Sequence, residues 1–587
     1  MYTRLKNTQI VIALLKKHNI RHLVLSAGQS NNNFVRSVET DDFFTCYSVV
    51  DERSAAFFAL GLAQELKEPV AISCTASTAC CNYLSAITEA YHQGVPILVL
   101  TSNKDIRRTD QLELLMIHQE SIFKDVCKKE IQLPEVRDKR DFNFCTRLVN
   151  DAILELNHNG NGPVHIDIPS YGNDATVDVS QLPQVRAIYR HKLTEGCKKY
   201  KEKLLSSKKI MLLCGQGFYS EKDQALIKKF YDHFNCVVVA EQMANLRLDD
   251  VINMNPITNS PIELTNDMLP DILITFGRHI MNATWSKLRN KGIEHWYVDV
   301  SGKVVDPCDA LTEIFECEIS EFLSYMVKNS ENVNKKKYFN VWNKAYNSLI
   351  VPNLPLCHIS VIQKLFEMLP EKGLIHYSIF NSIRLSQHFK LPKGFRCYAN
   401  LGALGIDGCL STFLGQASVT DEPAFLIIGD LSFFYDMNAL KIRHIKNNVH
   451  ILMINNSGGA EFYQNNGYYE TLDLHTAAKH NNTAKAWAEE CGFKYMAADN
   501  LEDLDSKMKQ FVSFSDAPVF FEVKTDIQTD MSALYKMNEV NSSKKTDSGS
   551  VKSIAKKFLG EKGSKLVGGV VKEYRDYKQF KESKNEH

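Results

Sequence analysis

With 587 residues, of which 44% are apolar, the chain can build the cores of three or four domains. Its 69 Lys and Arg residues balance its 69 Asp and Glu residues, so the composition lacks the basic excess typical of nucleic-acid-binding proteins. No run of about twenty apolar residues is present to cross a bilayer, and the 15 cysteines include no C-x-x-C pair, a usage typical of a reducing compartment. We expect a cytoplasmic protein with no transmembrane segment and no nucleic-acid partner.

The first part of the chain alternates apolar runs with helical patterns. Residues 3–18 predict an amphipathic helix rather than a signal peptide. Helices are also expected over residues 54–64 and 80–92, and strands at residues 22–25, 43–49, 69–74, 96–101 and 162–169. Continuous apolar strands separated by helices indicate a parallel sheet covered on both faces. We therefore expect a first domain over residues 1–180.

Two further units repeat this alternation. A central α/β domain is expected over residues 190–328, with strands at 209–214, 236–240, 272–277 and 295–300. Its turn at Gly215-Gln216-Gly217 is a lone G-x-G, which favours a tight turn without a ligand. A third domain is expected over residues 345–540, with strands at 373–377, 424–428, 449–454 and 519–523. The predicted fold class is α/β, with three consecutive doubly wound parallel-sheet domains.

The last residues, 541–587, differ in composition. They carry twelve Lys and Arg residues against six Asp and Glu residues and show no strand pattern. This composition predicts a basic, mostly disordered tail. The alternative is a short amphipathic helix around residues 551–559 that docks on a partner or a membrane face.

Glu52 stands between a strand-like run and the apolar helix of the segment VDERSAAFFALGLA. A carboxylate at such a position can share a proton with a nitrogen base. The alternative is purely structural: Asp51 caps the helix and Glu52 complements the helix dipole.

A second group of polar residues follows two strands of the third domain. Asp430 comes after the strand at 424–428, and Asn456 and Gly458 come after the strand at 449–454, with a helix expected at 437–445 between them. Because the carboxyl ends of parallel strands meet at one edge of a sheet, the Asp430 carboxylate, the Asn456 side-chain carbonyl and the Gly458 main-chain carbonyl are candidate Mg²⁺ ligands.

The turn itself offers an anion site. Gly429 precedes Asp430, and the backbone N–H groups of Leu431 and Ser432 open the next helix, where a diphosphate would bind. Either turn alone could be structural, because Gly-Asp and Asn-Asn are common turn pairs.

The segments DERSAAFFALGLA, GDLS and NNSGG together resemble the thiamine-diphosphate (ThDP) enzymes. Within them the chain is most similar, over residues 1–540, to the family of the menaquinone-pathway 2-succinyl-5-enolpyruvyl-6-hydroxy-3-cyclohexene-1-carboxylate synthase. The resemblance implies ThDP and Mg²⁺ as cofactors, with the first domain binding the pyrimidine and the third the diphosphate. It implies that Glu52 activates the cofactor. It also implies a homodimer or homotetramer whose active sites combine Glu52 of one chain with Asp430 of another.

Further cofactor and catalytic candidates follow from the same resemblance. The segment Gly402–Gly408 matches one that lies under the cofactor, where Leu404 or Ile406, beside Gly405, would hold its two rings bent; either can equally be a core residue. Ser382 is a candidate diphosphate donor. His118 and Gln119 lie on a loop where such enzymes place polar groups toward the reacting carbon; His118 is either a proton relay or a solvated loop histidine.

The substrate end departs from the family. Its arginines correspond here to Ser30, Lys104, Leu401 and Ser386, and the nearest arginine to the last position is Arg384. Arginine binds carboxylates through bidentate hydrogen bonds that Ser and Leu cannot supply, and each such hydrogen bond to a charged group is worth about 1.5 to 3 kcal/mol. We therefore expect a substrate less anionic than that of the menaquinone enzyme and richer in hydroxyl groups.

The function predicted is ThDP- and Mg²⁺-dependent decarboxylation of a 2-oxo acid, with transfer of the acyl-anion equivalent to an acceptor. Gln29, Ser30 and Lys104 are the substrate candidates, and Glu52, His118 and Gln119 the catalytic ones. Three alternatives stay open. They are the menaquinone-pathway synthase itself, acting on 2-oxoglutarate and isochorismate, a simple 2-oxo-acid decarboxylase, and a non-catalytic scaffold.

Overall fold

The computed structural model describes residues 1–171, 176–466 and 471–542. They form two compact units: residues 1–197 together with 294–318, and residues 198–293 together with the described residues from 319 onward. No helix in these described ranges is long and apolar enough to cross a membrane. From residue 543, the predicted basic tail lies outside the described residues.

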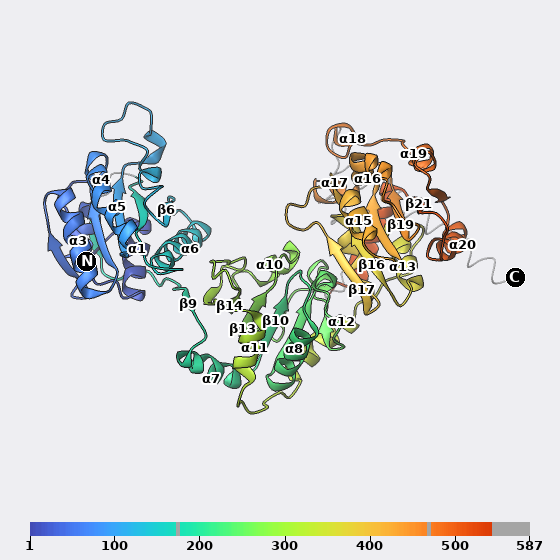
Figure 1. The fold of residues 1–587 in the computed structure, drawn as a ribbon, viewed down its shortest axis with the longest axis horizontal. Helices are drawn as coiled ribbons and strands as arrows, with labels where there is room; N and C mark the ends of the chain where they lie inside the picture. The colour runs from blue at the N-terminus through green and yellow to red at the C-terminus, as the bar shows by residue number, and fades with distance from the viewer. Residues whose placement is uncertain (172–175, 467–470, 543–587) are drawn as a thin grey trace. The chain divides into compact units, whose positions relative to one another are not determined.

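In its described part, the first unit contains a six-stranded parallel sheet of order β3-β2-β4-β5-β7-β6 (Figure 1). The strands are β2 (His22–Leu25), β3 (Thr45–Ser48), β4 (Val70–Cys74), β5 (Ile97–Asn103), β6 (Lys129–Gln132) and β7 (Val164–Pro169). The helices are α1 (Lys6–Lys17), α2 (Asn32–Val38), α3 (Glu52–Leu66), α4 (Thr78–Asn82), α5 (Leu84–Gln93) and α6 (Lys139–Glu155). A short antiparallel pair joins β1 (Tyr2–Thr3) to β8 (Val177–Val179).

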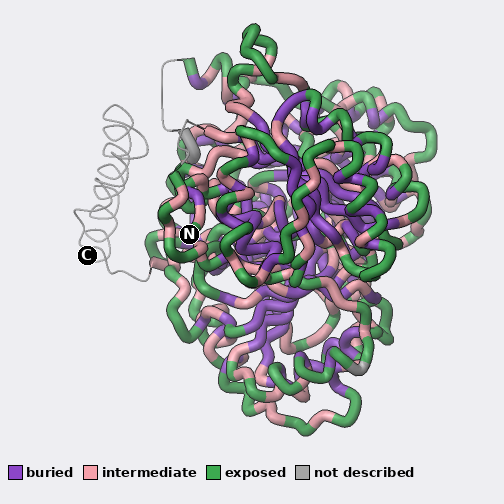
Figure 2. The backbone as a smooth tube through the Cα atoms, turned by 90° about the vertical axis from the view of Figure 1, so that its left-hand side faces the viewer, coloured by how far each residue is buried: buried purple, intermediate pink, exposed green. Residues whose placement is uncertain are grey.

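Both faces of this sheet are buried, because successive strand residues point to opposite sides. In β2, Leu23 packs in one apolar cluster with residues of α1 and α6, whereas Val24 packs in another with residues of α3 and α5. Figure 2 shows buried residues along the inner stretches of the backbone and exposed residues along its outer turns. This burial explains why the strands are continuous apolar runs.

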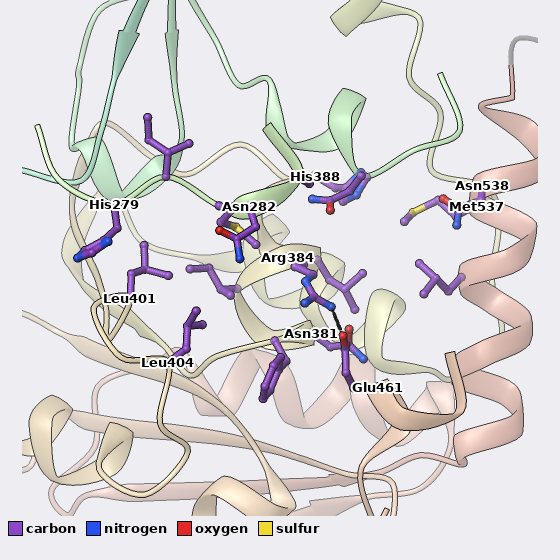
Figure 3. Close-up of a pocket in the computed structure, with 18 of the residues that line it drawn as sticks. His279, Asn282, Asn381, Arg384, His388, Leu401, Leu404, Glu461, Met537 and Asn538 are labelled. Carbon is purple, nitrogen blue, oxygen red and sulfur yellow. Dashed lines mark hydrogen bonds and ion pairs between the residues drawn. The ribbon is translucent and has the colours of Figure 1, made fainter. Parts of the chain in front are cut away.

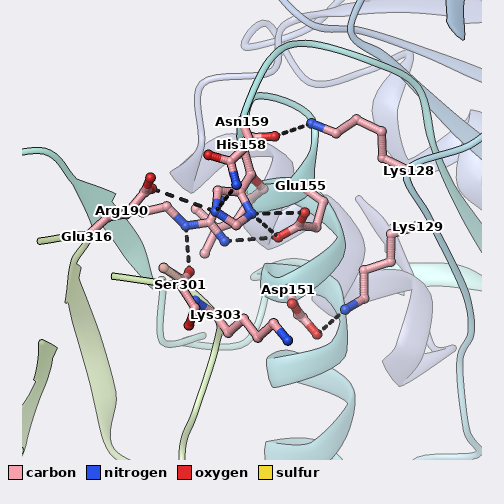
Figure 4. Close-up of polar contacts among 12 residues, drawn as sticks. Lys128, Lys129, Asp151, Glu155, His158, Asn159, Arg190, Ser301, Lys303 and Glu316 are labelled. Atoms are coloured by element: carbon pink, nitrogen blue, oxygen red, sulfur yellow. Dashed lines mark hydrogen bonds and ion pairs between the residues drawn. The ribbon is translucent and has the colours of Figure 1, made fainter. Parts of the chain in front are cut away.

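The first unit also holds three parallel strands from two parts of the chain: β9 (Tyr189–His191), β14 (Glu294–Val298) and β15 (Leu311–Phe315). A half-buried ion network secures them to the end of α6 (Figure 4). The Arg190 guanidinium donates to Glu155 Oε1 at 3.0 Å and to the Gly302 carbonyl at 2.7 Å. His158 Nδ1 lies 3.0 Å from the same Glu155 oxygen. These contacts are internal and give this cluster a structural role.

The second unit begins with a parallel sheet of order β12-β11-β10-β13. Its strands are β10 (Ile210–Cys214), β11 (Cys236–Ala240), β12 (Val251–Ile252) and β13 (Ile272–Phe276). Its helices are α7 (Lys198–Ser206), α8 (Glu221–His233), α9 (Asn255–Thr258), α10 (Asn282–Leu288), α11 (Ile319–Val327) and α12 (Lys337–Asn347). A Cβ added at Gly215 would lie 2.3 Å from the Arg278 carbonyl oxygen, so this glycine permits a close approach of two loops.

The rest of the second unit forms a parallel sheet of order β17-β16-β18-β19-β21-β20. Its strands are β16 (Lys372–Tyr377), β17 (Gly394–Ala399), β18 (Ala424–Gly429), β19 (Val449–Asn455), β20 (Lys494–Ala498) and β21 (Val519–Lys524). Its helices are α13 (His358–Met368), α14 (Asn381–Ser386), α15 (Cys409–Ser418), α16 (Asp430–Asp436), α17 (Ala460–Asn466), α18 (Leu472–His475), α19 (Lys485–Glu490), α20 (Leu501–Phe511) and α21 (Ile527–Val540). The predicted α/β class with consecutive parallel sheets is confirmed.

One predicted helix is wrong. The helix after Gly429 is α16, which starts at Asp430, and residues 437–441 form a 3-10 turn in place of the expected helix at 437–445. The indole N–H of Trp487 donates to the Met437 carbonyl at 2.8 Å. That carbonyl is therefore engaged outside the helix, which ends one residue earlier.

Candidate cofactor and substrate site

The two turns predicted to share a metal ion meet at the carboxyl edge of the last sheet. Asp430 opens α16 and is only 2% exposed. Its Oδ2 accepts a hydrogen bond from the Gly458 amide at 3.0 Å, and its Oδ1 accepts one from the Leu431 amide at 2.7 Å. The Leu431 N–H expected to hold a diphosphate is thus engaged with Asp430.

A small cavity of about 140 Å³ is lined by eight of the eleven residues predicted to bind the cofactor; Glu52, Leu404 and Gly405 do not line it. Those that line it are Ser382, Ile406, Gly429, Asp430, Leu431, Ser432, Asn456 and Gly458. Gly458 has φ +153° and an added Cβ would lie 2.8 Å from the Ala477 carbonyl oxygen. Only glycine fits this turn without strain.

A larger cavity of about 450 Å³ adjoins the small one, since Phe380, Asn381 and Glu461 line both (Figure 3). Leu404 lines the larger cavity, is 40% exposed and has φ +56°. Phe380 also has a positive φ, +58° with ψ −121°. Such backbone conformations cost about 1 to 3 kcal/mol each and concentrate at functional sites.

The charge of the larger cavity is largely compensated from within. The Arg384 guanidinium Nη1 lies 2.5 and 2.6 Å from the two carboxylate oxygens of Glu461 (Figure 3). Burial lowers the pKa of His388 to about 4, so this imidazole is uncharged at neutral pH. The cavity is therefore lined mainly by apolar and neutral polar groups, including the amides of Asn282 and Asn538.

Two positions at which the resemblance predicts arginine are buried. Leu401 is 6% exposed and belongs to the apolar core beside the larger cavity. Ser386 is fully buried and its hydroxyl donates to the Ser382 carbonyl within α14 at 2.6 Å. Neither residue presents a cation to the cavity.

The first unit holds the other predicted residues. Glu52 is the first residue of α3 and is half-buried, whereas Asp51 caps the helix by accepting from the Ser54 amide at 2.7 Å. The capping role is thus filled by Asp51. Exposed apolar side chains lie nearby on the same helix, with Phe57 43% and Phe58 44% exposed.

The predicted substrate loop after β2 is held against Thr75. A Cβ at Gly28 would lie 2.4 Å from the Thr75 Cβ, and the Ser30 amide donates to Thr75 Oγ1 at 3.2 Å. Gln29 beside it is exposed. Lys104 is paired: its Nζ donates to Glu113 Oε1 at 3.0 Å and to the Leu114 carbonyl at 2.7 Å.

His118 and Gln119 are adjacent but lie in different surroundings. His118 is exposed, and hydrogen bonds to the carboxylates of Glu120 and Asp110 raise its pKa. Gln119 is fully buried; its Oε1 accepts from the Ser77 amide at 2.6 Å and its Nε2 donates to Asp167 Oδ1 at 2.9 Å. Both ends of this amide are engaged within the protein, and its catalytic assignment stays a prediction.

Comparison with known proteins places these features in a family. The thiamine pyrophosphate enzyme N-terminal and C-terminal TPP binding domains match residues 5–125 and 381–523. The 2-succinyl-5-enolpyruvyl-6-hydroxy-3-cyclohexene-1-carboxylate synthase of Phocaeicola vulgatus is 36% identical over 548 residues, covering 91% of this chain and 98% of that protein. This chain belongs to the ThDP enzymes. Synthases with the same name from Bacteroides thetaiotaomicron (35% over 546 residues, 89% and 96% covered) and Bacteroides fragilis (34% over 556 residues, 90% and 98% covered) are similarly related.

A ThDP enzyme uses thiamine diphosphate with a divalent metal such as Mg²⁺. The donor set beside the small cavity fits that ion, because Asp430, Asn456 and the Gly458 carbonyl offer hard oxygen atoms. Among the described residues, no cluster of three His, Cys, Asp or Glu side chains offers an alternative metal site.

Three carboxylates of this ThDP enzyme were not identified from the sequence. Glu461 pairs with Arg384, Asp167 accepts from Gln119, and Asp530 accepts from Asn456 Nδ2 at 2.9 Å. Each is buried or nearly so, and each meets its partner across 48 to 77 residues of chain. No local spacing pattern signals such pairs.

Proposed function

We propose that this ThDP enzyme decarboxylates a 2-oxo acid less anionic than 2-oxoglutarate and transfers the acyl-anion equivalent to an acceptor. The Arg384–Glu461 pair carries the proposal, because it neutralises a cation that faces the larger cavity. Leu401 and Ser386 support it, since they stand where the resemblance to the family predicts arginine. The amides and neutral imidazole of the cavity favour a ligand bearing hydroxyl groups.

The chain's own residues have distinct roles in this proposal. Asp430, Asn456 and Gly458 would hold Mg²⁺, and Ser382 and Ser432 would border the diphosphate. Leu404 or Ile406 would support the cofactor rings, and Glu52 would share a proton with the pyrimidine. When bound, ThDP supplies the electron sink that lets CO₂ leave.

On the substrate side, we assign Gln29, Ser30 and Lys104 to substrate binding. We assign His118 and Gln119 to catalysis at the reacting carbon. Lys104 shares its charge with Glu113, as Arg384 does with Glu461. This second compensated cation also supports a weakly anionic substrate. His118, held between two carboxylates, is suited to proton transfer near neutral pH.

We infer a homodimer or homotetramer in which Glu52 of one chain completes the site of Asp430 in another. The apolar surface beside Glu52 supports this assembly, since Val50, Phe57 and Phe58 are 73%, 43% and 44% exposed. Clustered exposed apolar side chains of this kind mark interaction surfaces.

The second candidate function is the synthase activity named for the relatives. The 36% identity with the Phocaeicola vulgatus synthase, 98% of which is covered, favours this activity. The two candidates differ in the donor they use. CO₂ release from a panel of 2-oxo acids with ThDP and Mg²⁺, including 2-oxoglutarate with isochorismate, separates them.

The same assay separates the remaining alternatives. Under the proposal, a monocarboxylic 2-oxo acid releases CO₂ faster than 2-oxoglutarate, and added aldehydes are converted to hydroxyketones. A simple decarboxylase would release the aldehyde and leave the acceptors unchanged. A scaffold would neither bind ThDP nor release CO₂. Preferred turnover of 2-oxoglutarate with isochorismate would refute the proposed substrate class.

A further inference from the structure

Asp530 of α21 is a fully buried carboxylate that joins three separate segments of the second unit. Its Oδ2 accepts hydrogen bonds from Asn456 Nδ2 at 2.9 Å and from Thr525 Oγ1 at 3.0 Å. Its Oδ1 accepts one from the His358 amide at 2.8 Å. The carboxylate is thus fixed by three donors and lies directly behind Asn456.

The contact with Asp530 determines how the Asn456 side chain is turned. A carboxylate accepts hydrogen bonds and has none to donate, so Asn456 must present its NH₂ group to it. The carbonyl oxygen of the amide is then the atom left for the small cavity, which Asn456 lines with Asp430 and Gly458. An amide oxygen can ligate Mg²⁺, whereas an NH₂ group has no lone pair to offer.

We propose that Asp530 is a positioning residue for the metal site: it holds the Asn456 amide with its oxygen toward the divalent cation. The two ends of an amide differ little in size, so the shape of the surrounding protein alone selects its orientation weakly. A buried acceptor on one side selects it strongly, because the reversed amide would place two acceptors against each other. This inference rests on the proposed Mg²⁺ site.

A reciprocal exchange of the two side chains tests the inference. Asp530→Asn exchanges one carboxylate oxygen for an NH₂ group. With the remaining oxygen held by the His358 amide, this NH₂ group faces Asn456, which allows the Asn456 amide to reverse. Asn456→Asp places two carboxylates against each other. In the double variant Asn456→Asp/Asp530→Asn, the amide introduced at position 530 donates to one oxygen of the carboxylate introduced at position 456. The other oxygen of the carboxylate at position 456 remains for the cation. Thr525→Val is the matched control, because it removes a hydrogen bond to the same Asp530 oxygen and leaves the Asn456 contact in place.

The probe is Mn²⁺, measured on the full-length protein with ThDP by the electron paramagnetic resonance signal of the free ion. We expect Asp530→Asn to weaken Mn²⁺ binding about 10- to 100-fold, the range typical of residues that orient a metal ligand. Asn456→Asp should weaken it as well. The double variant should bind more tightly than either single variant, and Thr525→Val should bind like wild type. A residue with only a structural role would not give recovery in the double variant.

Three outcomes would overturn the inference or its basis. If wild type binds no Mn²⁺ with ThDP, the proposed metal site itself is wrong. If wild type binds Mn²⁺ and Asp530→Asn binds it equally well, Asp530 does not position Asn456. If the double variant binds no better than Asn456→Asp, the reciprocal contact is refuted, and this comparison holds even where Asp530→Asn fails to fold.

Discussion

Glu461→Gln is the substitution that bears most directly on substrate choice. In the wild-type structure, Arg384 Nη1 lies 2.5 and 2.6 Å from the two Glu461 oxygens, and the side chains are 32% and 11% exposed. The neutral amide leaves the guanidinium charge uncompensated beside the larger cavity. A charge-assisted hydrogen bond from Arg384 to a substrate carboxylate is worth about 1.5 to 3 kcal/mol. The kcat/KM for a dicarboxylic 2-oxo acid should therefore rise about 10- to 100-fold relative to a monocarboxylic one.

The assay is CO₂ release with ThDP and Mg²⁺ for each donor separately. Glu422→Gln is the control, because Glu422 Oε2 accepts from Arg396 Nη1 at 2.6 Å and neither residue lines the two cavities described. Arg396 is 31% exposed, close to Arg384, whereas Glu422 at 30% is more exposed than Glu461. Glu422→Gln should leave the preference between donors unchanged. If Glu461→Gln still binds ThDP and its preference between donors is unchanged, the view that Glu461 neutralises the charge of Arg384 toward the substrate is refuted.

Three other predictions follow from the site and its surroundings. Glu52→Gln should abolish CO₂ release while ThDP binding, followed by fluorescence quenching, persists; release at the wild-type rate would exclude Glu52 as the activating carboxylate. Leu401→Arg should lower the KM for dicarboxylic donors in steady-state assays, and a KM that rises equally for all donors would instead indicate a damaged core. Burial raises the pKa of the Glu241 carboxyl to about 7. The protonated carboxyl therefore contributes fully to the free energy of unfolding below its unfolded-state pKa. About 3 kcal/mol of that free energy is lost as the pH rises to about 7. Glu241→Gln should remove this decline in urea unfolding between about pH 5 and about pH 8, and an unchanged decline would contradict the assignment.

The central strands of the first and last sheets were predictable because both of their faces are buried, whereas the internal strand β15 was missed although four of its five residues are buried. Runs such as Phe425–Ile428 and Ile451–Ile454 carry apolar side chains toward both layers of helices. The edge strands β6, β17 and β20 were missed. Their sequences, KEIQ, GFRCYA and KYMAA, interleave polar or small residues, because one edge of the strand lacks a neighbour and its faces are only partly covered.

The residues of the candidate site also divide into those that the sequence predicted and those that it missed. That Asp430, Asn456 and Gly458 lie together at one cavity could be predicted from the sequence, because each follows a strand closely and a parallel sheet brings such segments together; their role as metal ligands stays a proposal. Glu461 and Asp530 could not be predicted, because their roles depend on partners 77 and 74 residues away. The family resemblance identified arginines that this chain lacks. The Glu461 carboxylate, which compensates the charge of Arg384, became visible only in the folded structure.

The central proposal is that this ThDP enzyme binds its cofactor and Mg²⁺ beside Asp430, Asn456 and Gly458 and takes its substrate in a cavity whose cation is compensated. The most direct test is the rate of CO₂ release by the wild-type protein, with ThDP and Mg²⁺, from monocarboxylic and hydroxylated 2-oxo acids against 2-oxoglutarate with isochorismate. We predict the higher kcat/KM for a donor without a second carboxylate, with the activity lost in Glu52→Gln. A higher kcat/KM for 2-oxoglutarate with isochorismate would contradict the account.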